Sequence, residues 1–527
     1  MTAARTDPRT GRSAVLVAVG ILCSRLAGLV RQRVIAHYFG LATDAADAWA
    51  AGFKIPNLLQ NLFGEGALSA SFIPVYAALV ARGDRRKADR VAGAIGALLA
   101  LVVSGIVLAG VVATPWLIAA VAPGFTGDRR ALTIAVVRIL FPGAGLLVMS
   151  AWCLGILNSH HRFFLSYAAP VIWSAAMIAA LLWYGGDTSL PRLVAILAWA
   201  SVVGSALQFA VQLPVVLTVA SELRFTIDMA SAEVRTVVGN FFPAFFSRGV
   251  VQLSAYIDTQ FASYLPIGAV AGLTNAATLY TLPVSLFGVA VSAAELPTMS
   301  NLEGADIAAL EGLRRRLDLG LRRIAFFVIP SAMAFMALGD IVAAALLQTG
   351  RFGHADAVYI WGILAGSSIG LLAQTLGRLY SSTYYALRDT RTPFRYALVR
   401  VALTTGLGYV CAFPLPRLLG ISPEWGVAGL TASAGIAGWV EMLLLRRALN
   451  ARIGPTGLPA NHVIKLWTAA AAGAIVAWAI KLWIPPLHPI PTAVLVLGPY
   501  GLVFGASAVA LRIKEAQMMV ARFHRSA

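Results

Sequence analysis

The chain has 527 residues, of which 59% are hydrophobic and 12% are charged. Soluble domains have roughly 45–50% apolar and about 25% charged residues, so this composition excludes an ordinary soluble enzyme. The formal net charge is +18, but most of the basic residues lie between apolar runs, which is typical of membrane topology and not of a nucleic-acid partner. The three cysteines all lie inside apolar runs and predict neither a disulfide framework nor a metal site.

Fourteen apolar segments are long enough to cross a bilayer as α-helices, so the predicted fold is an all-α polytopic membrane protein. The first segment contains Arg25, Arg31 and Arg33 and no small-residue cleavage site, so we interpret it as a retained span and not as a signal peptide. Segments such as 45–78, 235–264 and 356–386 exceed the minimum length, which predicts tilt or extension beyond the bilayer. The predicted spans are 13–37, 45–78, 91–121, 131–157, 164–185, 193–220, 235–264, 270–298, 320–347, 356–386, 394–415, 425–445, 464–485 and 490–511.

The loops on the two sides of these spans differ in their content of basic residues. The set of loops that includes both termini contains 27 Lys and Arg residues, and the opposite set contains 6. Cytoplasmic loops of membrane proteins carry the excess of basic residues, so both termini are predicted to lie in the cytoplasm. The remaining 8 basic residues lie within spans and need an explanation of their own.

Two pairs of similar segments indicate an internal repeat. LFGEGALSASFIP at 62–74 is similar to LFGVAVSAAELP at 286–297, and LNSHHRFFLSYA at 157–168 is similar to ALRDTRTPFRYA at 386–397. Chance similarity between apolar helices would explain each match alone, but both fall at corresponding places in two sets of six spans. The sequence therefore predicts two pseudo-symmetric six-helix lobes plus two C-terminal helices. The predicted domains are an N-terminal lobe at 1–221, a C-terminal lobe at 222–450 and an accessory region with a cytoplasmic tail at 451–527.

The arginines within the spans are the first candidates for function. A charge at the bilayer centre costs at least about 2.5–3.5 kcal/mol on insertion scales. Arg25 and Arg31 lie in the middle and the far half of the first span, with no acidic residue nearby in sequence. These two are therefore predicted to face water or a ligand. Snorkelling near a span end, or pairing between helices, is the favoured interpretation for Arg33, Arg138, Arg378 and Arg400.

The second span has a polar face. Lys54 and Glu65 are eleven residues apart, which returns to within about 20° of the same direction on an ideal helix, and Asp47 lies on the same face. Pro56 predicts a kink between them. Such a face either lines water, with Lys54 and Glu65 as a pair in a cavity, or forms buried ion pairs with other spans.

No catalytic motif accompanies these charges. The sequence has no paired carboxylates at metal-binding spacing, no Walker loop, no Ser/His/Asp set and no HExxH motif. Catalysis on a lipid pyrophosphate would normally need clustered acids for Mg²⁺ or a histidine nucleophile. The sequence therefore predicts a protein that is not an enzyme and needs no cofactor or metal. Its unpaired cations favour an anionic cargo, because guanidinium groups bind phosphate oxygens bidentately.

Two long segments carry a resemblance to a known family. SRLAGLVRQRVIAHYFG at 24–40 and ADAWAAGFKIPNLLQNLFGEGALSASFIPVY at 46–76 strongly resemble the MurJ/MviN family of lipid II flippases, within the multidrug/oligosaccharidyl-lipid/polysaccharide exporter superfamily. The similarity continues through APGF at 122–125, LPVSLFGVAVSAAELPTMS at 282–300 and DTRTPF at 389–394. The resemblance implies fourteen spans, two six-helix lobes and cytoplasmic termini, in agreement with the independent count. It also implies alternating access of a cavity between the lobes.

The resemblance implies roles for individual residues in the first two spans. Arg25 and Arg31 match first-span arginines that face the cavity of the family. Asp47, Lys54 and Glu65 match other polar positions in its second span.

The chain departs from the family pattern at two cavity positions. Gln60 and Thr278 stand where some relatives carry basic residues, so two expected cavity cations are missing. Arg248 in the seventh span is our hypothesis for the replacement charge. Asp258 matches a position that looks cation-binding in some relatives, but no convincing partner ligands accompany it.

We therefore predict a flippase that moves lipid II, an undecaprenyl-pyrophosphate-linked disaccharide pentapeptide, from the cytoplasmic to the outer leaflet of the bacterial inner membrane. Its expected partners are this lipid, the membrane lipids and cell-wall synthesis proteins. The sequence leaves open whether membrane potential, sodium or protons drive the cycle.

Other functions make different demands on the sequence. An exporter of another polyprenyl-pyrophosphate-linked oligosaccharide would use the same cations, whereas a drug exporter should have acids in its cavity. A membrane enzyme acting on polyprenyl phosphates should have clustered acids in its cytoplasmic loops. A structural scaffold for cell-wall assembly would tolerate loss of every arginine within the spans.

Overall fold

The computed structural model describes residues 8–228, 231–289, 307–485 and 487–526, together with residues 291, 292, 295 and 299. Its elements are helices throughout these residues. The contacts divide the chain into two compact units. Unit 1 consists of Met1–Ala271 with Thr349–Arg351, and unit 2 consists of Gly272–Gln348 with Phe352–Ala527.

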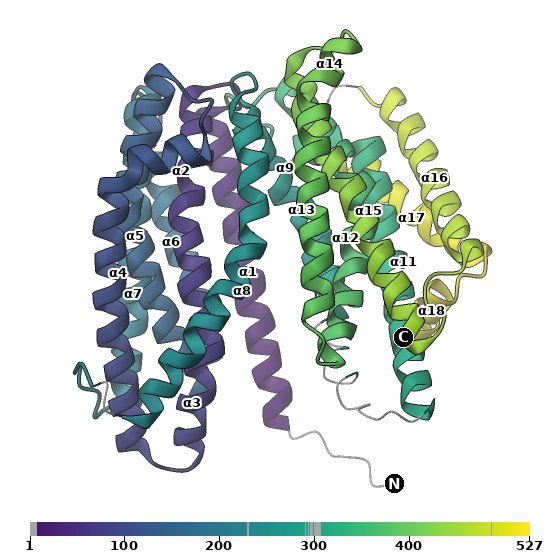
Figure 1. Cartoon of the computed structure of the whole chain (residues 1–527). Helices are drawn as coiled ribbons and strands as arrows, with labels where there is room; N and C mark the ends of the chain where they lie inside the picture. Colours follow the sequence, from purple (N-terminus) through teal and green to yellow (C-terminus); the bar gives the residue numbers. More distant parts are fainter. Residues whose placement is uncertain are drawn as a thin grey trace. The chain divides into compact units, whose positions relative to one another are not determined.

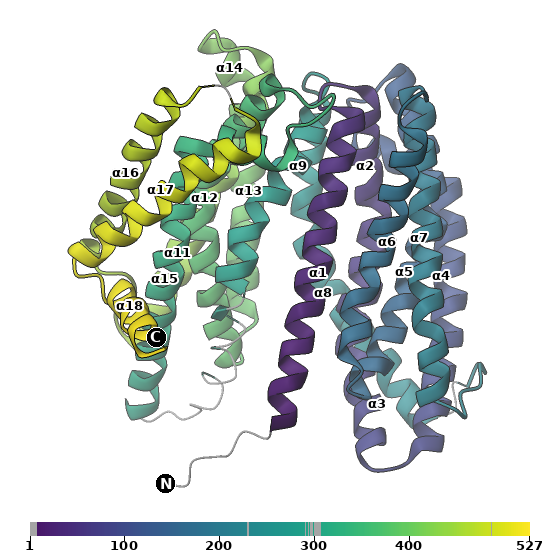
Figure 2. The same ribbon diagram turned by 180° about the vertical axis from the view of Figure 1, so that it is seen from behind.

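Unit 1 is built from long helices joined by short loops (Figure 1). Polar side chains begin some of these helices, since Thr43 accepts a hydrogen bond from the amide of Ala46, and Asp84 accepts one from the amide of Lys87. Both views show α4 to α7 lying side by side (Figures 1 and 2). The helices are α1 (Pro8–Phe39), α2 (Asp44–Leu59), α3 (Ser69–Ala81), α4 (Arg85–Val121), α5 (Gly127–Ser159), α6 (Phe163–Tyr184), α7 (Leu190–Val219) and α8 (Ala232–Ser263).

Unit 2 contains the remaining helices. Its central helices α11, α12 and α15 pack against one another, and α16 and α17 pack together against α11. The helices are α9 (Ala269–Pro283), α11 (Ile307–Leu347), α12 (His354–Ala386), α13 (Arg391–Ala412), α14 (Pro414–Leu418), η3 (Pro423–Trp425), α15 (Gly426–Ile453), α16 (Ala460–Trp483), α17 (Pro489–Ala510) and α18 (Lys514–Ser526). The first turn of α9 belongs to unit 1.

The two segments LFGEGALSASFIP and LFGVAVSAAELP share an uncommon backbone. A π-helix, η1 (Gln60–Leu68), contains the start of the first segment, and a second π-helix, η2 (Val284–Val289), contains the start of the other. π-Helices are rare and are frequent at functional sites. Their recurrence at matched positions supports the internal repeat, because apolar composition alone does not produce this geometry.

Eleven described helices are long and apolar enough to cross a membrane. They correspond to eleven of the fourteen predicted spans. The other three predicted spans, 13–37, 45–78 and 235–264, fall on α1, on α2 to α3, and on α8, which are helical as predicted. These segments contain Arg25, Arg31, Lys54 and Arg248, whose charges lower the mean hydropathy. The polytopic all-α fold is confirmed.

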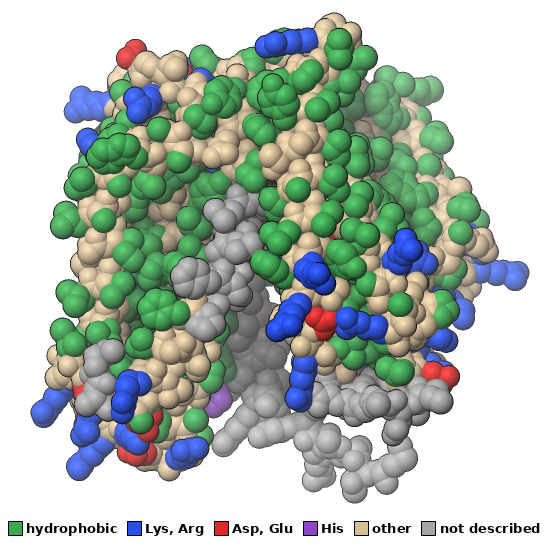
Figure 3. Space-filling model, in the orientation of Figure 1, with side chains coloured by type: hydrophobic (Ala, Val, Ile, Leu, Met, Phe, Trp, Pro, Cys, Tyr) green, Lys and Arg blue, Asp and Glu red, His purple; other side chains and the backbone are tan. Residues whose placement is uncertain are grey.

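The surface and the interior of the helices have the composition that a bilayer demands. Figure 3 shows a face that is mostly hydrophobic, with many Lys, Arg, Asp and Glu side chains towards the helix ends. In unit 1, a buried cluster that includes Phe72, Tyr76, Trp152 and Ile156 joins α3, α4 and α5. Apolar side chains thus face both lipid and core, and polar groups need partners inside the protein.

The seventh predicted span packs with unit 1. The described part of α8 contacts η1, α3 and α4, although the predicted N-terminal lobe ends at residue 221. The described contacts thus place α8 with the helices that precede it. The three predicted domain limits stay predictions.

Candidate substrate-binding site

Arg31 is embedded in unit 1 against neutral partners. It lies on the second half of α1, which packs along α6. The Nη1 atom of Arg31 donates to the Ser174 hydroxyl at 3.3 Å, and its guanidinium lies over the Trp173 ring at 4.5 Å from the centroid. Neither partner carries a negative charge, so the positive charge of Arg31 is stabilised but not neutralised.

Arg25 lies six residues earlier on α1 and is exposed. It makes no hydrogen bond or ion pair with any residue that the structure describes. Two arginines of the same helix are therefore held differently. Arg31 is fixed against α6, whereas Arg25 is accessible.

An aromatic stack links Arg31 to the second predicted span. The Phe53 ring stacks on Trp173 with centroids 5.8 Å apart and on Trp49 at 5.3 Å. The indole Nε1 of Trp173 donates to the carbonyl oxygen and to the hydroxyl of Ser201, both at 3.1 Å. Trp173 is thereby fixed by α7, and Lys54 follows Phe53 directly in the chain. The structure brings the neighbourhoods of Arg31 and Lys54 together within unit 1.

Lys54 is held by α8. Its Nζ donates to the Thr259 hydroxyl at 2.7 Å, and the Tyr256 hydroxyl donates to the Lys54 carbonyl at 2.9 Å. Asp258, which we predicted as a cation site, lies within electrostatic range of the Lys54 ammonium. A fixed cation of the protein therefore lies near Asp258. Among the described residues there is no group of three or more His, Cys, Asp or Glu side chains that could hold a metal ion.

Asp47 is completely buried and has a full set of partners. It accepts hydrogen bonds from the amides of Gly268 and Ala271, both at 2.9 Å, and from Nη1 of Arg129 at 3.2 Å. These contacts tie α2 to α5 and to the chain after α8. They support a structural role for Asp47, since no oxygen of this carboxylate is accessible to a ligand.

Two predicted site residues have side chains outside the described part of the structure. Glu65 lies within η1 and Arg248 within α8, and only their backbone is described. The proposed Lys54–Glu65 pair and the replacement charge at Arg248 stay predictions.

Sequence reasoning missed the residues that position the cations. Trp173, Ser174 and Thr259 are neutral residues of apolar spans, so charge alone did not single them out. Trp173 and Ser174 could have been noticed because they lie in the middle of the span 164–185. Tryptophan is more usual at the two membrane interfaces, so a tryptophan at mid-span indicates a specific contact.

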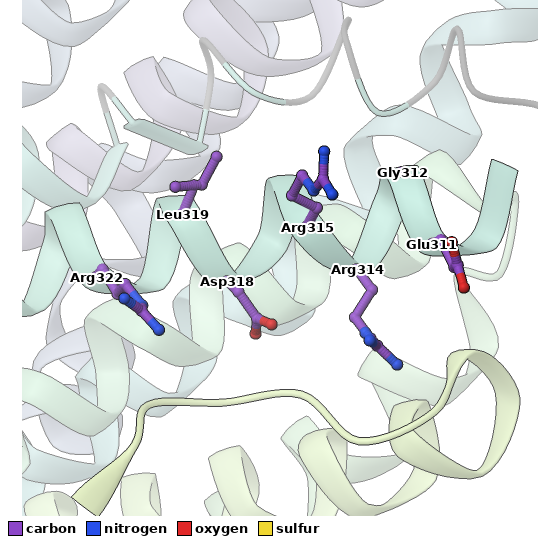
Figure 4. A pocket seen from close by; sticks show the side chains of 7 residues that line it. All are labelled: Glu311, Gly312, Arg314, Arg315, Asp318, Leu319 and Arg322. Carbon is purple, nitrogen blue, oxygen red and sulfur yellow. The ribbon is translucent and has the colours of Figure 1, made fainter. Parts of the chain in front are cut away.

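A charged pocket lies outside the predicted site, on the N-terminal half of α11. Its volume is about 730 Å³. Asp318 accepts a hydrogen bond from the amide of Gly457 at 3.1 Å, which fastens the loop after α15 to this helix. The pocket overlaps the basic segment 314–323, which belongs to the set of loops predicted to be cytoplasmic. Figure 4 shows that the residues that line it on α11 are Glu311, Gly312, Arg314, Arg315, Asp318, Leu319 and Arg322.

Comparison with known proteins identifies the family. The sequence profile described as "Lipid II flippase MurJ" matches residues 35–496. The chain belongs to the MurJ family of lipid II flippases. A lipid II flippase MurJ of Burkholderia cenocepacia is 33% identical over 451 residues, which cover 84% of each chain. A probable lipid II flippase MurJ of Rhizobium meliloti is 29% identical over 508 residues, covering 93% of this chain and 90% of the relative.

Solved structures show the same fold. A lipid II flippase MurJ in an inward closed conformation matches with a TM-score of 0.75 at 22% identity, covering 94% of this chain and 99% of that chain. An inward-facing multidrug resistance MATE family transporter of the MOP superfamily matches with a TM-score of 0.65 at 17% identity, covering 83% and 98%. The predicted membership in the MurJ family and in this transporter fold is confirmed.

Proposed function

We propose that this chain moves lipid II from the cytoplasmic to the outer leaflet of the bacterial inner membrane by alternating access, without covalent chemistry. Both termini would lie in the cytoplasm. Membership in the MurJ family supports the substrate. The excess of basic residues in one set of loops supports the orientation.

The observation that carries the proposal is the charge of Arg31. This guanidinium lies within the predicted span 13–37, and its described partners are the Ser174 hydroxyl and the Trp173 ring. An ionisable side chain within a span is by default a candidate functional group, and Arg31 has no counter-ion among the described residues. The pyrophosphate of lipid II supplies the missing negative charge, and a guanidinium suits it because two parallel N–H donors match two phosphate oxygens.

Arg25 and Lys54 complete the proposed site. Arg25 is an accessible cation of α1, and the aromatic stack Trp49–Phe53–Trp173 connects the Lys54 neighbourhood to Arg31. An inside-negative membrane potential favours the outward movement of an anion by about 2.3 kcal/mol per charge per 100 mV. The same potential resists return of an anionic headgroup, so the net direction follows from the charge of the cargo.

The test is the appearance of lipid II on the outer leaflet. A bacterium depleted of its own flippase expresses this chain or a variant, and externally accessible lipid II is measured. We expect Arg31→Ala and Arg25→Ala to lower the flipping rate at least about tenfold, equivalent to about 1.4 kcal/mol. Arg138→Ala is the matched control, because Arg138 is an exposed arginine within a span of the same unit. Full flipping by both α1 variants would refute the proposed site.

A further inference from the structure

Unit 2 contains a cluster of charged residues within its spans. Arg378 lies on α12, Arg400 on α13 and Glu441 on α15. Arg378 is eight residues before the end of α12, and Arg400 is nine residues after the start of α13. At 1.5 Å per residue, both lie roughly 12–14 Å from the neighbouring helix ends. Both arginines are therefore about two helical turns or more from these helix ends.

Arg400 and Glu441 form an ion pair. Nη1 of Arg400 donates to Oε2 of Glu441 at 3.1 Å, and the two side chains are 28% and 14% exposed. The pair joins α13 to α15, which pack along each other. The prediction of an interhelical pair for Arg400 agrees with this contact.

Arg378 adds a second guanidinium beside this pair. A Cβ atom at Gly377 would lie 3.8 Å from the Cβ of Met442, which brings α12 next to α15 at the level of Glu441. Arg378 is exposed, lies within electrostatic range of Glu441, and has no hydrogen bond or ion pair to a described residue. Two guanidinium groups therefore lie within electrostatic range of one carboxylate, which is paired with Arg400, and these three groups have a net positive charge.

Tyr280 adds an unpartnered polar group. Its hydroxyl is buried and has no hydrogen-bond partner among the described residues. It lies within electrostatic range of both Arg378 and Arg400. Buried polar groups are normally hydrogen-bonded, so this hydroxyl, within electrostatic range of two cations, is a candidate donor to a bound anion. A phenol can donate to a phosphate or carboxylate oxygen.

We propose that Arg378, Arg400 and Tyr280 form a second anion-binding subsite, which takes a phosphate or carboxylate group of the lipid-linked substrate within unit 2. This subsite rests on the proposed function, because it needs an anionic lipid as cargo. Arg378 provides the unneutralised charge, and Glu441 competes with the ligand for Arg400. The phosphate and the carboxylate are alternatives within one substrate, since lipid II carries a pyrophosphate and a peptide carboxylate.

The experiment measures binding of undecaprenyl pyrophosphate and of lipid II to the purified full-length protein in detergent. We expect Arg378→Gln to weaken binding of at least one of these lipids about tenfold or more. The matched control is Arg395→Gln, which removes an exposed arginine nearer the start of α13. This control should change binding less than twofold. Glu441→Gln should strengthen binding a few-fold, because it removes the negative charge that competes with the ligand for Arg400. The thermal transition of each variant reports whether it is folded.

Each outcome decides one question. Weaker binding of both lipids by Arg378→Gln identifies the pyrophosphate, and weaker binding of lipid II alone identifies the peptide carboxylate. A folded Arg378→Gln variant that binds both lipids as tightly as the wild-type protein would overturn the subsite. If Arg31→Gln weakens binding in the same experiment, the proposed function still stands. Failure of the wild-type protein to bind either lipid would instead refute the proposed function. Weaker binding by a folded Glu441→Gln variant would show that the pair is structural, and would overturn the assignment of Arg400.

Discussion

Asp44 and Asp47 begin the same helix and face the same arginine, but their surroundings differ. Asp47 is buried and accepts three hydrogen bonds, one of them from Arg129 at 3.2 Å. The Asp44 side chain is 47% exposed, and its carboxylate is 4.0 Å from Arg129. A buried charge that loses its partner is costly, whereas an exposed pair contributes little. These two acids allow a direct comparison of the two situations.

We expect Asp47→Asn to destabilise the protein by about 3 kcal/mol, because it removes the buried negative charge closest to Arg129 and turns an N–H group towards backbone donors. Asp44→Asn is the control and should change stability by less than about 0.5 kcal/mol. The melting temperature of the purified protein in detergent measures both effects. Equal melting temperatures for the two variants would contradict the structural role of Asp47.

The conformation of the segment DTRTPF at 389–394 is stabilised by the carboxylate of its first residue, Asp389. Asp389 accepts hydrogen bonds from the hydroxyl and the amide of Thr392 and from Arg452, whose Nη1 lies 2.8 Å from the carboxylate. These donors hold the pKa of Asp389 at about 2, with Thr392 as the largest cause. A lowered pKa means that this stabilisation is present above the ordinary carboxylate range and is lost only as the pH falls towards 2. The loop is therefore charged and fixed at neutral pH.

At the scale of elements, small residues set the distance between helices in unit 2. A Cβ atom at Gly370 of α12 would lie 2.3 Å from the Cα of Gly435 on α15, and one at Gly366 would lie 2.4 Å from the carbonyl oxygen of Ala428. The two backbones therefore touch, as is usual where glycine lines a helix interface in a membrane. The same two helices carry Arg378 and Glu441, which lie within electrostatic range of each other.

We expect Gly370→Ala to destabilise the protein by about 1–3 kcal/mol, because the new methyl group overlaps backbone that cannot rotate away. Gly406→Ala on α13 is the control, since a Cβ there meets nothing within 4 Å. Thermal unfolding of the two variants, with lipid binding measured in parallel, tests this difference. The reverse order of stability would show that α12 and α15 lie farther apart than the structure indicates.

At the scale of the whole molecule, the distribution of basic residues predicts the orientation. The two sets of loops contain 27 and 6 basic residues. Arg86 lies in the set of loops with 27 basic residues, and Asp187 lies in the set with 6. Both residues are exposed at the ends of described helices or in the loops between them.

We expect a cysteine at Asp187 to react with a membrane-impermeant maleimide in intact spheroplasts, and a cysteine at Arg86 to react only after permeabilisation. The background replaces the native residues Cys23, Cys153 and Cys411. Lipid II flipping by each variant shows that the protein is correctly inserted. Labelling of Arg86→Cys before permeabilisation would reverse the proposed orientation.

The sequence by itself determined the membrane class, the limits of most spans, the predicted orientation and the family resemblance. Hydropathy, loop charge and motif letters are local properties, so they can be read without knowing which helices touch. The sequence also singled out Arg25, Arg31 and Lys54, because a charge in an apolar run is conspicuous whatever surrounds it.

Only the tertiary structure decided what each of these charges contacts. Ser174 is 143 residues from Arg31, and Thr259 is 205 residues from Lys54. The amide of Gly268, 221 residues away, reaches Asp47. Such partners depend on which helix faces pack together, and apolar faces of similar composition do not specify their neighbours in the sequence. Packing is therefore what makes these two charged residues different. Asp47 is surrounded by hydrogen-bond donors, whereas Arg31 has no described counter-ion.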